Sequence, residues 1–343
     1  IEPVTSTHAK EHGMVTAPTT LRDIARACGV SVSTVSRALA NNPAIAKKTR
    51  ETIQAIAKEL DYRPNAQARA LKSSRTDAIG LVVPSLINPF FSAMAAAIED
   101  EANQAGYATI ITSSGENTPK ITEAIEALRA RQVDGIIAVP HAKSVEMLEH
   151  VARSTPLLFI DRYIHGSNIP AVVSNSAPGI KAALEALASR GHKKIGYLAG
   201  PQTTSTGLER LKDFQRFCEE LGLEPNIHHG GYLHEEGFTG TQKLLEQQPT
   251  AIIAGDSMMT FGALEALYRE NVDIGKQIAL VGFDDFVFMR IQPAPVSIID
   301  QNVEEMGRTA LRNLVASFAG KSPPEGAVVQ TRFIARESIE FSP

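Results

Sequence analysis

The feature that most constrains the fold is a regular alternation of short apolar runs with amphipathic segments from Ala78 onward. One series of runs is AIGLVVP, TIITSS, GIIAVP, LLFID and AVVS, and a second is KIGYLAG, AIIAG, IALVGFDD and SIID. Strand–helix alternation on this scale predicts parallel α/β sheets, and two series predict two similar doubly wound lobes. The segments expected to be helical are 91–105, 122–131, 179–190, 208–221 and 259–269.

The N-terminal part has a different pattern, that of three short helices. LRDIARAC carries apolar residues at the i, i+3, i+4, i+7 spacing of a helix, and IQAIAKEL repeats this spacing. Thr20 with Asp23 predicts a cap for the first helix, Gly29 is expected to end it, and Ser31 is expected to cap the second. Helix, glycine turn, helix and a bracing third helix predict an all-α helix-turn-helix domain.

The second of these helices, within GVSVSTVSRALANN, offers a core only Val35, Ala38 and Leu39. Its other positions carry small hydroxyls and Arg37. In a helix-turn-helix domain this helix lies in the DNA major groove, where hydroxyls contact phosphates or base edges and an arginine can reach guanine O6 and N7. The alternative is a polar surface helix, because short helices rich in serine and threonine are common.

The charge distribution favours DNA over that alternative. Residues 1–76 contain 12 Lys and Arg and six Asp and Glu, so they carry 12 − 6 = +6. Because the whole chain carries −4, the remainder carries −4 − 6 = −10. A basic head on an acidic body suggests that the head binds a polyanion.

Residues 62–77, YRPNAQARALKSSRTD, are expected to connect the head to the body. Pro64 prevents the third helix from continuing, and the helix-compatible residues 65–71 are too short to be stable alone. Leu71 beside Lys72 pairs an apolar wedge with a phosphate contact, as in proteins that kink the minor groove. A chance leucine in an interdomain linker is the alternative.

Polar and aromatic side chains follow the predicted strands in both lobes, where ligands of such folds bind. Carboxylates and guanidiniums can form paired hydrogen bonds to vicinal hydroxyls while aromatic rings cover C–H faces, so this set predicts a sugar-like ligand. An aspartate at a strand end is usually a helix cap or loop residue, but six such sites over two lobes favour a pocket. The residues are Asn88, Phe90, Phe91, Asp161, Arg162, Arg210, Asp256, Asp284 and Gln301.

Other chemistries lack their motifs. The sequence has no G-x-S-x-G elbow, no phosphate-binding G-x-x-x-x-G-K-[ST] and no G-x-G-x-x-G after the first strand, so neither catalytic residues nor a cofactor are predicted. The histidines show no metal-like pairing with acids, and the pair His228 and His229 is expected to precede a strand, in a surface loop. No metal site is predicted.

The location of the protein is expected to be cytoplasmic. No apolar run approaches the roughly 18–20 residues that a membrane helix needs, and the N-terminus lacks the apolar core of a secretory signal. Cys28 and Cys218, far apart and without metal spacing, fit two reduced cysteines. Residues 1–18 are expected to be a disordered leader or an expression remnant, with the native start near Met14.

The chain resembles the LacI/GalR family of bacterial transcription regulators over about residues 19–341. The resemblance is carried by TLRDIARACGVSVSTVSRALANNPAIAKKTRETIQAIAKELDYRPNAQARALKSS in the head and by DGIIAVP, RGHKKIGYLAG, ALVGFDD and ARESI in the body. It implies a body like a two-lobed periplasmic sugar-binding protein and a homodimer on a palindromic operator. It also implies that Val32 and Ser33 contact bases, beside Ser36 and Arg37, and that Leu71 is the hinge leucine that wedges into a central base step.

The resemblance also implies the residues of both sites. The body is similar to ribose-binding relatives, although Asp256 stands where the family often has asparagine and Ser257 where it has aspartate, which puts plain ribose in doubt. Thr204 stands where the purine-binding relative has arginine, so a purine is less expected. The predicted DNA-binding residues are Thr20, Ser31, Val32, Ser33, Thr34, Ser36, Arg37, Asn41, Tyr62, Asn65, Ala68, Leu71 and Lys72. The predicted effector-binding residues are Asn88, Phe90, Phe91, Asp161, Arg162, Thr206, Arg210, Asp256, Asp284 and Gln301.

The sequence therefore predicts a DNA-binding repressor whose operator affinity is controlled by a ribose-like sugar or nucleoside. A purine, a phosphorylated sugar or a protein corepressor is the alternative, and a sugar receptor or a sugar- or nucleoside-processing enzyme is a remote one. The expected domains are the helix-turn-helix at 19–63, the hinge at 64–76 and the effector and dimerisation domain at 77–343. Within the last, lobe 1 is expected at 77–175 and 302–331 and lobe 2 at 176–301 and 332–343.

Overall fold

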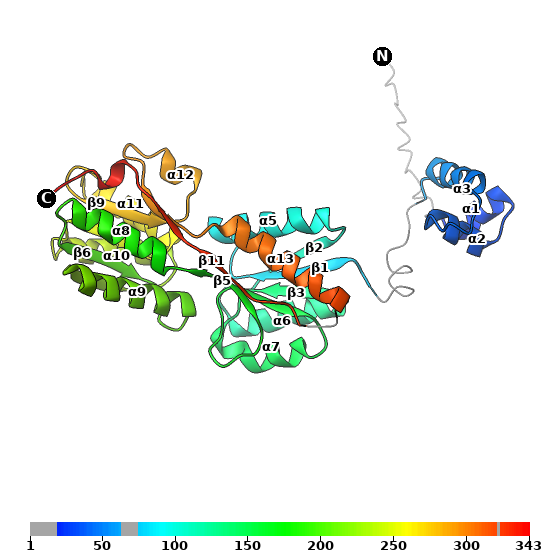
Figure 1. The fold of residues 1–343 in the computed structure, drawn as a ribbon, viewed down its shortest axis with the longest axis horizontal. Helices are drawn as coiled ribbons and strands as arrows, with labels where there is room; N and C mark the ends of the chain where they lie inside the picture. Colours follow the sequence, from blue (N-terminus) through cyan, green and yellow to red (C-terminus); the bar gives the residue numbers. More distant parts are fainter. Residues whose placement is uncertain (1–18, 63–74, 321–322) are drawn as a thin grey trace, which may run out of the picture. The chain divides into compact units, whose positions relative to one another are not determined.

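The computed structural model describes residues 19–62, 75–320 and 323–343. The chain forms two compact units, Ile1–Ser74 and Arg75–Pro343 (Figure 1). The predictions for the leader and for most of the hinge, with Asn65, Ala68, Leu71 and Lys72, lie outside the described residues.

The first unit has three helices in its described part: α1 (Leu21–Cys28), α2 (Val32–Leu39) and α3 (Lys47–Glu59). The carboxylate of Asp23 accepts hydrogen bonds from the backbone N–H and the hydroxyl of Thr20, at 3.0 and 2.6 Å, and so caps α1 as expected. Gly29 ends α1 in the left-handed conformation (φ 64°), which costs glycine little. The three helices share one apolar core, formed by Ile24, Ala25, Val35, Ala38, Ile53 and Ala57.

The second unit contains two six-stranded sheets within its described residues. The sheet of lobe 1 has the order β11-β5-β4-β3-β1-β2 and is parallel throughout. The sheet of lobe 2 has the order β12-β10-β9-β8-β6-β7, with only β12 antiparallel to its neighbour. The strands of lobe 1 are β1 (Ala78–Val83), β2 (Ala108–Ser113), β3 (Gly135–Ala138), β4 (Leu157–Asp161), β5 (Ala171–Asn175) and β11 (Ala327–Gln330). Those of lobe 2 are β6 (Lys194–Ala199), β7 (Glu224–His229), β8 (Ala251–Ala254), β9 (Ala279–Phe283), β10 (Ser297–Asp300) and β12 (Arg332–Ile334).

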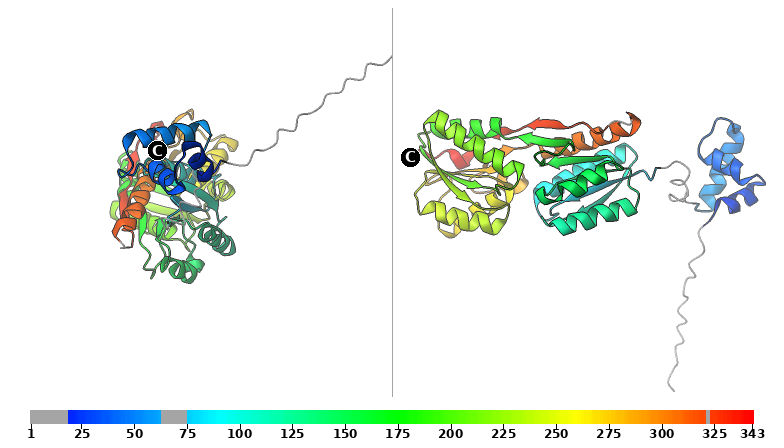
Figure 2. Two further views of the ribbon diagram at one scale, coloured as in Figure 1. Left: turned by 90° about the vertical axis from the view of Figure 1, so that its right-hand side faces the viewer. Right: turned by 90° about the horizontal axis from the view of Figure 1, so that it is seen from below.

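Helices cover both faces of each sheet, which confirms the prediction of two doubly wound lobes (Figures 1 and 2). In lobe 1, α5 (Pro89–Gln104) and α13 (Val303–Gly320) pack on one face, and α6 (Thr118–Ala130) and α7 (Val145–Ala152) on the other. In lobe 2, α8 (Ala177–Ser189) and α9 (Ser205–Leu221) cover one face, and α10 (His234–Leu245) and α11 (Ser257–Arg269) the other. The short helices are η1 (Ala142–Ser144), α12 (Val287–Arg290) and η2 (Glu337–Ile339).

The chain passes between the lobes three times, from β5 to α8, from β10 to α13 and from β11 to β12. Each lobe is therefore built from segments that are distant in sequence. The carboxyl ends of β4, β8 and β10 and the N-termini of α5, α9 and α11 supply most of the residues that line the space between the lobes.

Some details differ from the expectations. Helices α6 and α9 begin four and three residues earlier than predicted, because Asn117 and Thr204 cap them through the backbone N–H groups of Lys120 and Gly207. His228 and His229 do not precede a strand: they are the last two residues of β7 itself, which pairs with β6. This edge strand was not predicted because its sequence, EPNIHH, is mostly polar.

Candidate DNA-contacting surface and ligand pocket

Helix α2 buries one side and exposes the other. Val35 and Ala38 are fully buried in the core of the first unit, whereas Ser31, Ser33 and Arg37 are exposed. Val32 is 40% exposed, although it is a branched apolar residue at the start of the helix. The exposed side therefore offers one apolar side chain, two hydroxyls and one guanidinium for contact with another molecule.

The predicted DNA-contacting residues differ in exposure. Ser31 caps α2 by accepting from the Thr34 backbone N–H at 3.2 Å, and its hydroxyl lies 2.8 Å from those of Ser33 and Thr34. Arg37 donates from Nε to the carbonyl of Ser33, at 3.2 Å, so its guanidinium lies along the helix surface. Thr34, Ser36 and Tyr62 are partly buried, and Thr20 and Asn41 are exposed.

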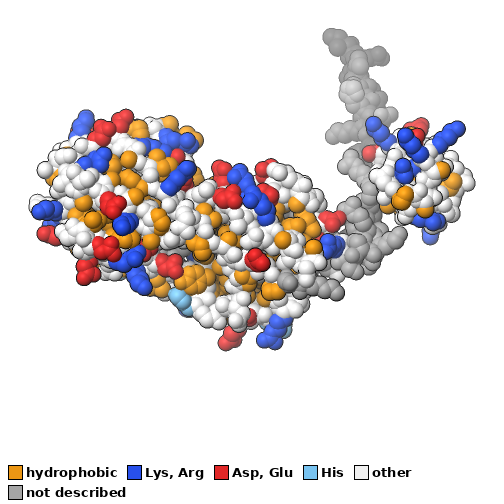
Figure 3. Space-filling view, viewed as in Figure 1, with side chains coloured by type: hydrophobic (Ala, Val, Ile, Leu, Met, Phe, Trp, Pro, Cys, Tyr) orange, Lys and Arg blue, Asp and Glu red, His pale blue; other side chains and the backbone are white. Residues whose placement is uncertain are grey.

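Two of these residues hold the unit together. The Asn41 side-chain oxygen accepts from Nε2 of Gln54 at 2.8 Å, which joins the turn after α2 to α3. Tyr62 packs against the apolar core, and burial raises the pKa of its hydroxyl. Lys and Arg side chains project from the surface of this unit in Figure 3.

In the second unit, a narrow pocket lies between the two lobes, and its empty space, counted out to open solvent, is about 280 Å³. It brings together nine of the ten predicted effector residues. The tenth, Asp284, is not in the lining: it lies one hydrogen bond behind Gln301, whose Nε2 donates to its Oδ1 at 2.9 Å. The lining residues are Asn88, Phe90, Phe91, Asp161, Arg162, Thr206, Arg210, Tyr232, Asp256 and Gln301.

Local structure explains how several of these side chains come to face the pocket. Asn88 caps α5 by accepting from the Phe90 backbone N–H at 3.0 Å, and Pro89 sets the first turn. Asp256 caps α11 by accepting from the Met259 backbone N–H at 3.0 Å. The caps thus place polar atoms where helix N-termini approach the strand ends.

Arg162 is buried between two carboxylates. Its terminal nitrogens lie 2.8 and 2.9 Å from the two carboxylate oxygens of Glu116, and its Nε lies 3.2 Å from Asp161. Burial raises the pKa of Asp161, and Arg162 opposes that shift. Burial alone would lower the pKa of Arg162, but its carboxylate neighbours raise it above the ordinary value. The arginine is therefore a fixed cation in the pocket.

Arg210 belongs to a second network. Its terminal nitrogens donate to the Gly255 carbonyl at 2.8 Å and to the side-chain oxygen of Gln301 at 2.6 Å, and its guanidinium lies over the ring of Phe283, 4.6 Å from the centroid. Gln301 continues the network to Asp284. Burial raises the pKa of Asp284 to about 7, against the opposing effect of the hydrogen bond from Gln301.

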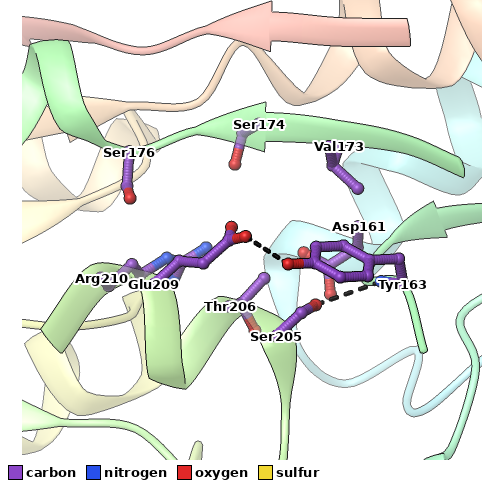
Figure 4. Close-up of a pocket in the computed structure, with 9 residues that line it drawn as sticks. All are labelled: Asp161, Tyr163, Val173, Ser174, Ser176, Ser205, Thr206, Glu209 and Arg210. Carbon is purple, nitrogen blue, oxygen red and sulfur yellow. Dashed lines mark hydrogen bonds between the residues drawn. The ribbon is translucent and has the colours of Figure 1, made fainter. Parts of the chain in front are cut away.

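Two further cavities adjoin the pocket. One, a shallow hollow without room for a water molecule, lies beside the end of β5, at Val173, Ser174 and Ser176 (Figure 4). There the Tyr163 hydroxyl contacts Glu209 at 2.5 Å and its backbone N–H donates to Ser205 at 3.1 Å, so lobe 1 is joined to lobe 2 (Figure 4). The other has about 1600 Å³ of empty space, counted out to open solvent, and shares Arg162 and Tyr232 with the pocket.

The pattern of the sequence did not reveal two residues of this site. Tyr232 follows a Gly-Gly pair after β7, and Glu116 lies in the loop after β2. Neither lies directly at the end of an apolar run, which was the signal used for the others.

Within the described residues, no group of three or more His, Cys, Asp or Glu side chains is arranged to hold a metal ion. None of the helices described is long and apolar enough to cross a membrane.

Comparison with known families matches both parts of the chain. Residues 20–65 match bacterial regulatory proteins of the lacI family, and residues 76–337 match periplasmic binding proteins and the sugar binding domain of the LacI family. The chain belongs to the LacI family. This LacI-family protein is a DNA-binding transcriptional regulator with an effector domain of the periplasmic-binding-protein type.

Individual relatives agree with this assignment. The LacI-family chain is 31% identical over 328 residues to a ribose operon repressor of Haemophilus influenzae, covering 93% of this chain and 98% of that one. It is 29% identical over 330 residues to a transcriptional repressor, PurR, of Pasteurella multocida, covering 94% and 98%. These relatives are transcriptional regulators, not enzymes.

Solved structures of the family have the same fold. A Lac repressor dimer bound to operator and the anti-inducer ONPF has a TM-score of 0.85 and 26% identity, covering 94% of this chain and 99% of that one. A probable LacI family regulator from Corynebacterium glutamicum has a TM-score of 0.73 and 41% identity, covering 77% of this chain and 100% of that one.

Proposed function

We propose that this LacI-family chain is a repressor that binds a palindromic operator as a homodimer and responds to a ribose-like sugar or nucleoside held between its lobes. The observation that carries the proposal is the narrow pocket at the strand ends, lined by buried arginines, carboxylates and two phenylalanines. The chain is proposed to act in the cytoplasm and to catalyse no reaction, since the pocket is built to hold a ligand.

The lining suits a small polyhydroxyl compound. Arg162 and Asp161 together offer donors and acceptors to neighbouring hydroxyls, and both are about 96% buried, so these hydrogen bonds form away from water. Phe90 and Phe91 pack edge to face with ring centroids 5.1 Å apart and can cover the C–H face of a sugar ring. The proposed effector residues are the ten predicted from the sequence, with Tyr232 added and Asp284 acting through Gln301.

The proposed DNA contacts lie on α2. Val32 and Ser33 would contact base edges, and Arg37 would reach guanine, because these three side chains are exposed on the side of α2 opposite the core. The proposed domains keep the predicted boundaries: 19–63 for DNA binding, 64–76 for the hinge and 77–343 for the effector and dimerisation domain. The crossings between β5 and α8, between β10 and α13 and between β11 and β12 support the division into lobes.

The proposed dimer contact is an apolar surface on lobe 2, next to α12. Phe261 and Phe288 pack edge to face at 5.4 Å in a groove that Leu264 and Tyr268 also line. Phe288 is 48% exposed and Ile291, just beyond α12, is 69% exposed. Large apolar side chains gathered in the open on one face are typical of a protein interface.

In the proposed mechanism, the effector shifts the equilibrium between two arrangements of the lobes. The cross-lobe contacts of Tyr163 with Glu209 and of Arg162 with Tyr232 would form fully in only one of them. A ligand can shift such an equilibrium only by its differential affinity for the two states. A coupling of roughly 1–3 kcal/mol, equivalent to about a 5- to 150-fold change in operator affinity, is typical.

The test is a titration of DNA binding with ribose, uridine and a series of other pentoses and hexoses. The DNA is a pool of palindromes with a central CG step, at a stated salt concentration. A several-fold change in operator affinity caused by one of these ligands supports the proposal. Tight DNA binding that none of them alters would contradict the proposed pocket chemistry and leave a purine, a phosphorylated sugar or a protein corepressor as the effector.

A further inference from the structure

The pocket contains more carboxylates than cations. Asp161, Asp256, Asp284 and Glu116 face or support it, against Arg162 and Arg210, so its formal charge is 2 − 4 = −2 when all are ionised. All but Glu116 are at least 92% buried, where charges interact more strongly than in water. Because burial raises the pKa of Asp284 to about 7, the surplus is smaller than two charges near neutral pH, but the pocket has no excess of positive charge to offer an anion.

Both arginines already have partners in the protein, although Nε of Arg162 forms no hydrogen bond among the described residues. Arg162 has carboxylates on two sides, from Glu116 and Asp161. Arg210 donates to the Gly255 carbonyl and to Gln301, and through Gln301 it is connected to Asp284. A sugar phosphate would have to compete with these partners and would add charge to a pocket that is already negative.

Among the carboxylates that line the pocket, Asp256 has hydrogen-bond partners but no cation in direct contact. It accepts hydrogen bonds from the backbone N–H groups of Met259, at 3.0 Å, and Met258, as the cap of α11. No lysine, arginine or histidine among the described residues forms an ion pair with it, and Arg210 and Arg162 act on it only from a distance. Its carboxylate lines the pocket and can only accept hydrogen bonds when ionised.

The cap itself helps to keep this carboxylate ionised. The N-terminus of α11 offers two N–H groups and the positive end of the helix dipole, although burial raises the pKa of Asp256. A ligand cation would add the direct partner that the protein does not supply. A charge-assisted hydrogen bond is about twice as strong as a neutral one.

We propose that the effector is a small polyol that carries a protonated amine, and that this amine contacts Asp256. The proposal rests on the proposed function, and it implies that the pocket rejects sugar phosphates. The class comprises amino sugars and imino sugars of about monosaccharide size. The hydroxyls of such a ligand would contact Arg162 and the Asp161 carboxylate, and its amine would approach the N-terminus of α11.

The test compares matched pairs of probes by calorimetric titration of the full-length protein, in a buffer without primary amines. Each pair consists of an iminopentitol and the anhydropentitol of the same configuration, which has oxygen in place of the ring nitrogen. Glucosamine with glucose is the hexose pair, and ribose phosphate is the anionic probe. We expect the amine of at least one pair to bind about tenfold or more tightly than its oxygen partner, and the phosphate to bind more weakly than ribose.

Two variants test whether the preference for the amine depends on Asp256. Asp256→Asn keeps an N-cap that can accept from Met259, so the fold is retained, and it should reduce the amine preference to about threefold or less. Asp100→Asn, at an exposed position on α5 outside the pocket, removes the same charge from the same unit without altering the cap of α11 and should leave the preference in place.

The outcomes separate the two proposals. If the oxygen partners or the phosphate bind the wild type as tightly as the amines, or if Asp256→Asn keeps the preference, the amine inference is overturned while the sugar pocket stands. If no probe of any charge binds the wild type, the proposed pocket itself is overturned, and the amine inference with it.

Discussion

The guanidinium of Arg162 lies over the ring of Tyr232, 5.4 Å from the ring centroid, and this contact joins lobe 1 to lobe 2 beside the pocket. Tyr232 is held from its other end, because its hydroxyl contacts that of Thr206 at 3.0 Å. The ring therefore forms a wall of the pocket and a link between the lobes at the same time. A ligand that contacts Arg162 would also act on this link.

Replacing Tyr232 should weaken effector binding. Tyr232→Ala removes the cation–π contact and part of the pocket lining, and we expect about a fivefold to tenfold loss of effector affinity, since such contacts are worth about 0.5–2 kcal/mol. Tyr232→Phe keeps the ring and should cost about threefold or less. Titration of the effector against each variant measures both. Equal losses in the two variants would show that the hydroxyl, not the ring, makes the contribution.

On the DNA side, Arg37→Ala should relax specificity at one operator position. Arg37 is exposed, and its one hydrogen bond within the described residues goes to the Ser33 carbonyl of the same helix, so its removal should leave the core of the first unit intact. A guanidinium paired with guanine is worth about 1–3 kcal/mol of discrimination. Selection of bound sequences from a random pool, repeated for the variant, measures the change.

The matched control for this variant is Arg26→Ala. Arg26 is an exposed arginine on α1, and it pairs with Asp23 in the same helix turn. Its loss removes the same charge from the same unit and should not change which base is preferred at any position. Equal loss of affinity of Arg37→Ala for operator and for random DNA would remove Arg37 from base recognition.

Much of the fold could be predicted because strand burial leaves a strong signal. Strands buried on both faces, such as β1 and β4, are largely apolar, and each of the nine apolar runs overlaps a strand. Strands β7, β11 and β12 were not predicted, because each lies at a sheet edge and is partly exposed. In β7, for example, EPNIHH carries neither an apolar run nor alternation. Helix starts were misjudged where a cap such as Asn117 or Thr204 precedes the first apolar residue.

The pocket could be predicted only where its residues lie directly after strands or at helix starts. Arg210 and Gln301 are 91 residues apart, yet the shared rule that ligands bind at strand ends was enough to group them. Tyr232 and Glu116 lie in loops whose paths depend on packing between distant segments, so no local pattern marks them. The pairing of Arg162 with Glu116, which sets the charge of the pocket, needed the structure.

The apolar surface beside α12 should govern the oligomeric state. Ile291→Asp places a charge on a side chain that is 69% exposed, so the monomer fold should tolerate it, whereas a dimer interface would not. We expect monomers at micromolar concentration by analytical ultracentrifugation and a steep loss of affinity for a two-half-site operator. Leu208→Asp on α9, where the leucine is 41% exposed, is the control and should leave a dimer. A dimeric Ile291→Asp variant would move the interface elsewhere.

The last prediction concerns pH. In the folded protein the pKa of Asp284 is about 7, whereas its ordinary value is 3.8, because burial disfavours the charged form. A carboxyl whose pKa is raised on folding stabilises the fold while it is protonated, so this contribution is complete only below about pH 4 and is lost as the pH rises through 7. With about 1.36 kcal/mol for each pKa unit, the free energy of unfolding should fall by about 2–3 kcal/mol between about pH 5 and 8 on account of this group.

Asp284→Asn should remove that part of the slope and make the protein more stable than the wild type at alkaline pH. Asparagine tolerates the left-handed backbone at this position (φ 64°), and its side-chain oxygen can still accept from Gln301. Urea unfolding of the full chain across this pH range measures the slope, with Asp100→Asn, a change at an exposed carboxyl, as the control. A slope that Asp284→Asn leaves unchanged would assign the pH dependence to Asp161 and Asp256, whose pKa values burial also raises.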